Sequence, residues 1–146
     1  MAIELPDINL MLAILDQAHP NHIRGKAWFS SASVTGWATC PLTQNGFVRV
    51  LSTQSYPGIR MRTEDAVALL KTAVANHPLT HHFWEDSISI YDASLINPTR
   101  LRGPKQITDI YLLALCQKHR STFVTFDQGI TVEAIVSPHP NLLKTL

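Results

Sequence analysis

Apolar residues follow two alternating patterns along this chain: short continuous runs, and longer stretches at helical spacing. The runs predict strands at residues 2–6, 37–40, 88–90 and 123–126, and a final one near 134–136. The spaced stretches predict helices at residues 8–17, 23–31, 42–51 and 108–119, and one that begins at Thr63. Strands that alternate with helices imply parallel pairing and right-handed crossovers. The pattern therefore predicts an α/β fold, a three-layer α/β/α sandwich with a central, mainly parallel sheet.

Capping and breaking residues suggest where these elements begin and end. Thr63 is the expected N-cap of its helix, and His77-Pro78 stops that helix. Residues 52–61, which contain Pro57-Gly58, and residues 95–106 are expected to form loops.

Size and composition narrow the class of protein. The chain has 146 residues, 45% hydrophobic and 16% charged, as expected for one globular domain over residues 1–146. The net charge of +1 neither requires nor excludes a nucleic-acid partner. Basic residues do concentrate in the middle of the chain, at Arg60, Arg62, Lys71, Arg100, Arg102 and Lys105.

The expected compartment is a reducing cytoplasm. The two cysteines, Cys40 and Cys116, make no disulfide framework, and Cys116 falls within an apolar helix, where a core position is expected. Glu4 and Asp7 interrupt the N-terminus where a secretion signal would be apolar. No apolar stretch is long enough to predict a membrane span.

Three aspartates occupy similar settings far apart in the chain. Asp7 and Asp127 each end an apolar run, and Asp109 lies at the start of an apolar helix. Such positions lie at one edge of an open α/β sheet, where these sheets bind ligands. Three anions at one edge repel one another unless a cation neutralises them, and ligands that are all oxygen suit Mg²⁺ or Mn²⁺. The sequence therefore predicts a metal-dependent enzyme that acts on phosphates.

Other kinds of site fit the sequence less well. The seven histidines are scattered, and none forms the helical His-x-x-x-His pair typical of zinc sites. No Gly-x-Ser-x-Gly segment predicts a serine hydrolase. A phosphoacceptor domain of the response-regulator type also clusters aspartates, but it needs an early acidic pair, and no acidic pair precedes Asp7.

Three segments resemble the PIN-domain nucleases, and most closely the VapC-type toxins of bacterial toxin–antitoxin pairs. The segments are Pro6–Leu10, Gln106–Leu115 and Val124–Ile130, and the similarity extends over essentially the whole chain, including His82–Asp86. Each aspartate alone could be a helix N-cap. The order and spacing of all three within this resemblance favour a shared metal site.

The resemblance implies a metal-dependent endoribonuclease, the toxin of a toxin–antitoxin pair. Asp7, Asp109 and Asp127 carry over as catalytic and metal-binding residues for Mg²⁺ or Mn²⁺, with Asn9 and Thr125 as small polar residues that brace them. Arg49 and Lys105 are expected to hold the RNA backbone. The implied partners are a cognate antitoxin, an RNA substrate and a second copy of the chain, with the interface expected at Phe47–Leu51 or Ala66–Val74.

One departure from the family pattern concerns a glutamate on the helix after the second strand. Here no acid occurs between Asp16 and Glu64, so its place falls at Gln44, Asn45 or Gly46, and the residues that follow favour Gly46. Amides at 44 and 45 could still accept hydrogen bonds around the site. We expect three carboxylates, weaker metal binding and one ion in place of two. The alternative is a non-catalytic PIN-like binding module with a decayed acidic site.

Overall fold

The fold is built on a five-stranded sheet, and Asp7 and Asp127 follow the carboxyl ends of two of its strands. The computed structural model describes residues 2–53, 56–57 and 61–146, so Gly58 of the expected loop and the basic residue Arg60 lie outside the described residues. The helices and strands follow the order β1 (Glu4–Pro6), α1 (Ile8–Leu15), α2 (His22–Thr35), β2 (Trp37–Thr39), α3 (Pro41–Leu51), α4 (Thr63–Ala75), β3 (His81–Phe83), η1 (Pro98–Arg100), η2 (Pro104–Gln106), α5 (Ile107–Lys118), β4 (Thr122–Thr125) and β5 (Leu143–Thr145).

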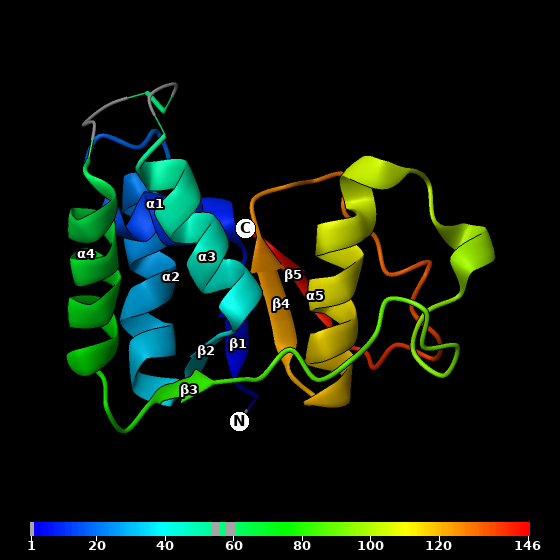
Figure 1. Ribbon diagram of the computed structural model, residues 1–146. Coiled ribbons are helices and arrows are strands. Elements are labelled where there is room, and N and C mark those ends of the chain that lie inside the picture. The colour runs from blue at the N-terminus through cyan, green and yellow to red at the C-terminus, as the bar shows by residue number, and fades with distance from the viewer. Residues whose placement is uncertain (1, 54–55, 58–60) are drawn as a thin grey trace.

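All strand pairs are parallel, and the strand order is β3-β2-β1-β4-β5. Figure 1 shows α1 to α4 on one side of the sheet and α5 on the other. The expected three-layer α/β/α fold with a parallel sheet is therefore confirmed. Among the described residues, no helix is long and apolar enough to cross a membrane.

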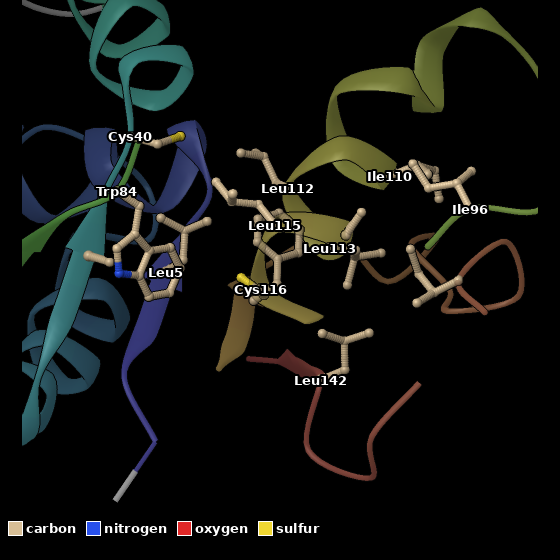
Figure 2. Packing of buried hydrophobic residues seen from close by; sticks show 14 of the residues in the cluster. Leu5, Cys40, Trp84, Ile96, Ile110, Leu112, Leu113, Leu115, Cys116 and Leu142 are labelled. Atoms are coloured by element: carbon tan, nitrogen blue, oxygen red, sulfur yellow. The ribbon is translucent and has the colours of Figure 1, made fainter. Parts of the chain in front are cut away.

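The two faces of the sheet have separate apolar cores. Phe123 of β4 packs with Leu5 and α5 in one cluster, whereas its neighbour Val124 packs in a second cluster with Leu10 of α1. This alternation is what a central parallel strand requires, since successive side chains point to opposite faces. In Figure 2, Leu112, Leu115 and Cys116 lie on the side of α5 that faces Leu5 of β1. The expectation that Cys116 is a core residue is confirmed, because its side chain is fully buried.

Two strands lie elsewhere than the sequence predicted. The third strand is His81–Phe83, not 88–90, and the last is Leu143–Thr145, not 134–136. Ile88 and Ile90 instead pack against the apolar cluster on the α5 side, and Ile135 makes an isolated antiparallel bridge with Ile96. The true strands are the two edges of the sheet and are largely exposed, so they contain no apolar run that would have revealed them.

Helix boundaries differ by smaller amounts. Thr63 is the first residue of α4 and Arg62 is its N-cap, because Arg62 has an extended backbone and Thr63 is already helical. The helix predicted at 23–31 extends over His22–Thr35, and the one predicted at 8–17 ends at Leu15.

Helix α1 packs closely on α3 at Gly46, a residue that has no side chain. Gly46 of α3 is buried against Ile8, and a Cβ built at Gly46 would lie 2.1 Å from Ile8 Cδ1 and 3.0 Å from Ile8 Cγ1. Isoleucine is restricted at χ1 in a helix, which holds Ile8 Cγ1 close to Gly46, whereas Cδ1 can turn about χ2. Ile8 therefore occupies the space that any side chain at position 46 would need.

We predict that Gly46→Ala lowers the free energy of unfolding by about 1–3 kcal/mol, because overpacking a close contact forces neighbours to shift. In an Ile8→Ala background the same substitution should be neutral, or stabilising by up to about 1 kcal/mol, since alanine is the better helix former. Urea unfolding of the four proteins gives the coupling between the two positions. Gly46→Ala that stabilises the wild-type chain would contradict this packing.

Candidate functional site

The edge at which β1 and β4 end brings distant residues together. Pro6 pairs with Val124, and the Asp7 backbone N–H donates to the Val124 carbonyl at 3.0 Å. Asp7 and the segment from Thr125 to Asp127 therefore leave the sheet side by side. Neighbouring strands that end at the same edge form the usual ligand-binding position of an open α/β sheet.

Both carboxylate oxygens of Asp7 are held by hydrogen bonds. Oδ1 accepts from the Leu10 N–H at 2.7 Å, so that Asp7 is also the N-cap of α1. Oδ2 accepts from the Thr125 hydroxyl at 2.5 Å. Thr125 Oγ1 in turn accepts from the Asp127 N–H at 2.9 Å. Thr125 thus braces one aspartate directly and the backbone of a second.

Asp109 and Asp127 line the same surface hollow. Asp109 lies in the first turn of α5, and Asp127 lies in the loop after β4. Both line a cavity of about 240 Å³, and Lys105 lines it with them. Asp127 Oδ1 accepts from the Gly129 N–H at 2.8 Å, which orients this carboxylate within its loop.

The ionisation of Asp7 and of Asp109 is disfavoured by their surroundings. Burial, together with the charges of Asp7 and Asp127, raises the pKa of Asp109 from 3.8 to about 6. Burial also raises the pKa of Asp7; hydrogen bonds from Thr125 and Leu10 act in the opposite direction, and the charge of Asp127 adds to the rise. Asp127 thus acts on both Asp7 and Asp109, so negative charge of the three aspartates contributes to one local field.

These residues suit a hard divalent cation as an open site rather than a closed cage. Among the residues that the structure describes, no three His, Cys, Asp or Glu side chains are grouped so that they could hold an ion alone. The expectation that the three aspartates share one metal site stays a prediction. Mg²⁺ commonly binds one or two carboxylates and keeps several waters. Asp109 and Asp127, beside the same hollow, fit that mode of binding, and their ligand atoms are all oxygen.

Several residues expected around the site make other contacts. Asn9 Oδ1 pairs with His19 Nε2 at 3.0 Å and does not brace a carboxylate. Gln44 donates to the Thr39 hydroxyl at 3.0 Å. Asn45 is exposed on α3, and Arg49 is exposed in its last turn, outside the lining of the acidic hollow. Of the two basic residues expected to hold RNA, the structure brings only Lys105 to the aspartates.

The position favoured for the family glutamate is Gly46, and its surroundings explain how the chain manages without that acid. Ile8, the residue after Asp7, fills the space beside Gly46. A glutamate introduced at position 46 alone would collide with Ile8 before it could reach the site.

Sequence reasoning missed other residues of the hollow, including Gln106, Ile130 and Thr131. Gln106 and Ile130 belong to the two segments that flank Asp109 and Asp127, so the signal was present in those motifs. None of them is acidic or basic, which is why a search for metal ligands passed over them.

The chain is similar to one family of known proteins. The PIN domain family model matches residues 5–132. The chain is 45% identical over 142 residues to Ribonuclease VapC44 of Mycobacterium tuberculosis, a match that covers 97% of this chain and 98% of the relative. It is 34% identical over 128 residues to Ribonuclease VapC38 of the same organism, covering 86% of each. Ribonuclease VapC39 is 30% identical over 130 residues, covering 89% of this chain and 92% of the relative.

We predict that Asp109→Asn stabilises the metal-free protein at pH 8, because it removes one of three repelling charges. With allowance for partial exposure of this carboxyl, the gain is about 1 kcal/mol, or about 2–4 °C in Tm for a domain of this size. The measurement is thermal unfolding in the presence of a chelator.

The pH dependence provides the internal check. The folded-state pKa of Asp109 is raised from 3.8 to about 6. Below pH 3.8 the carboxyl is protonated and does not destabilise the wild-type fold. As the pH rises through about 6 the carboxyl ionises in the folded state, and the free energy of unfolding falls. The difference between the proteins should therefore disappear at low pH. Glu85→Gln, an exposed charge removal elsewhere, is the matched control. An Asp109→Asn protein less stable than wild type at pH 8 would refute the repulsion.

Proposed function

We propose, from the premise that this chain belongs to the PIN-domain family of VapC-type ribonucleases, that it is a divalent-metal-dependent endoribonuclease and the toxin of a toxin–antitoxin pair. The observation that carries the proposal is the coupled set of Asp7, Asp109 and Asp127 at one sheet edge. Such a field of uncompensated anions is unfavourable for folding alone. Binding of a cation at this site would neutralise that charge.

The residues have separable roles in this proposal. Asp109 and Asp127 would hold the cation from opposite sides of the hollow, and Asp7 would contribute its charge from a fixed orientation. Lys105, on the same hollow, would bind a phosphate of the RNA backbone. A bound Mg²⁺ or Mn²⁺ would supply Lewis-acid polarisation of the phosphate and lower the pKa of water. Thr125 is a positioning residue, because it acts through Asp7 and the backbone of Asp127.

The alternative is a binding module of the same fold without catalysis. Two observations favour it: no acid occurs between Asp16 and Glu64, and no ready-made group of three metal ligands occurs within the described residues. Calorimetric titration of the purified protein with Mg²⁺ and Mn²⁺ separates the two functions. A decayed site should bind neither ion.

We predict that Asp7→Asn lowers metal-dependent cleavage of single-stranded RNA by about a hundredfold or more, as loss of a preorganised charge at the reacting centre commonly does. Thr125→Val should lower cleavage or metal affinity by about 10–100-fold. Thr125→Ser retains the hydroxyl and should stay close to wild type. Circular dichroism must show that each variant is folded. Wild-type rates in Asp7→Asn would rule out this catalytic account.

The family implies an antitoxin partner and an RNA substrate in general, and we propose a homodimer as well. The helix faces first expected at its interface are unsuitable, since Phe47, Leu51, Ala66 and Leu70 are buried within one protomer. The edge strand β3 is a better candidate. Phe83 on this strand is 53% exposed and Leu79 just before it is 93% exposed. Exposed apolar side chains at an unpaired strand edge are typical of contact surfaces.

Light scattering should therefore give twice the chain mass of 16.3 kDa, and Phe83→Glu should shift the protein towards monomer. A strict monomer at high concentration would overturn the dimer. A Phe83→Glu protein that remains dimeric would place the interface elsewhere on the surface.

A further inference from the structure

The hollow beside Asp109 and Asp127 has room for more than a metal ion. Its volume of about 240 Å³ lies just below the ~300 Å³ at which pockets for drug-sized ligands begin. It is therefore large enough for one small ring system and too small for a paired, stacked helix. A ligand of this size, placed beside the acidic edge, would lie next to the reacting phosphate.

The walls of the hollow offer apolar surface together with a few polar groups. Ile110 of α5 is 4% exposed, and Ile130 in the loop after β4 is half-buried. Gln106 and Thr131 line the same space. A flat ring would contact the isoleucines with its faces and the polar groups with its edges. This combination is how single-stranded bases are recognised when they leave their stack.

Gln106 presents a donor, and its orientation is set by the backbone. Its Oε1 accepts from the Arg102 N–H at 3.2 Å, which leaves the Nε2 end of the amide as the group available to a ligand. Among the described residues, Nε2 has no acceptor within hydrogen-bonding distance. An amide N–H₂ group pairs with a carbonyl oxygen. Guanine and uracil present such an oxygen on their pairing edge, where adenine carries the N6 amino group. The bidentate pairing of a glutamine with adenine also needs Oε1 as an acceptor, and here Oε1 already accepts from Arg102.

The two walls are joined by an ion pair. Arg102, whose backbone orients Gln106, binds Glu133 at 2.9 Å, and Glu133 follows the loop that carries Ile130 and Thr131. Both side chains are about half exposed, so the pair adds little to global stability. Its effect is geometric, because it connects the turn before α5 to the loop after β4.

We propose that this hollow is a nucleobase subsite for unpaired RNA, in which Gln106 selects a base with a carbonyl oxygen next to the phosphate that is cut. The proposal rests on the ribonuclease function proposed above. Lys105 contributes backbone affinity without regard to the base. Gln106 contributes the preference between bases, and it is the residue whose change should alter specificity.

The test uses 2′-O-methyl hexanucleotides of uridine, guanosine and adenosine. Attack by metal-activated water does not need the 2′-hydroxyl, so gel electrophoresis after each titration must show that the oligomers remain intact. Fluorescence anisotropy in Mg²⁺ should show that the uridine and guanosine oligomers bind about tenfold more tightly than the adenosine oligomer. One hydrogen bond made by an otherwise unpaired donor gives a difference of that order. Gln106→Ala should bring the three affinities to within about twofold of one another.

Two further variants serve as controls. Gln106→Glu keeps the oxygen that accepts from Arg102 but replaces the donor, so it should fold normally and lose or reverse the preference. Gln128→Ala removes an exposed glutamine beyond Asp127 that does not line the hollow, and it should keep the wild-type preference. The ratio of affinities is the readout, because a new charge at position 106 lowers binding of every oligomer alike.

The outcomes separate this subsite from the proposed function. Equal affinities in the wild type, or an unchanged preference in both Gln106 variants, would overturn the subsite, while cleavage of unmodified RNA would leave the ribonuclease proposal standing. If the wild type binds none of the oligomers and cleaves no RNA in either metal, both proposals are wrong.

Discussion

The pairing of β1 with β4 is the constraint on which the rest of this structure depends. It joins residues 118 positions apart, and the hydrogen bond from the Thr125 hydroxyl to Asp7 completes it at the edge of the sheet. The bond is buried, so it is not weakened by competition with water. Without this pairing, Asp7 would not lie beside the segment from Thr125 to Asp127. The helix α1, whose N-cap is Asp7, would also lose its fixed orientation relative to the sheet.

The negative charge of the aspartates at this edge lowers the stability of the fold but suits a site that binds a cation. Burial and mutual repulsion disfavour the ionised forms of Asp7 and Asp109, so the fold alone would be better served by neutral residues there. Proteins keep such groups at sites that bind or react, where a ligand relieves the repulsion. The Thr125, Leu10 and Gly129 hydrogen bonds orient carboxylates that would otherwise turn away from one another.

Packing decides how many acids the edge can carry. Ile8 follows Asp7 directly, and its side chain occupies the space beside Gly46 that a longer residue on α3 would need. The two positions therefore form one unit, in which a large apolar residue on α1 goes with glycine on α3. The hollow between α5 and the loop after β4 is lined by Asp109 and Asp127 and by neither of these two residues.

The sequence by itself determined the fold class and the α-helices to within a few residues, and it predicts the three aspartates as one group. These features depend on neighbouring residues alone. Helical periodicity is visible within each segment, and each aspartate lies at the end of an apolar run or at the start of an apolar helix. The tertiary structure alone decided the edge strands. Residues 88–90 and 134–136 are apolar because they pack against the α5 side of the core, whereas β3 and β5 are polar because they face solvent. An apolar run indicates burial, and whether burial comes from a strand or from a packed loop depends on partners far away in the chain. The same is true of Asn9 and Gln44, whose type suited the site but whose bonding partners, His19 and Thr39, were set by how the helices pack.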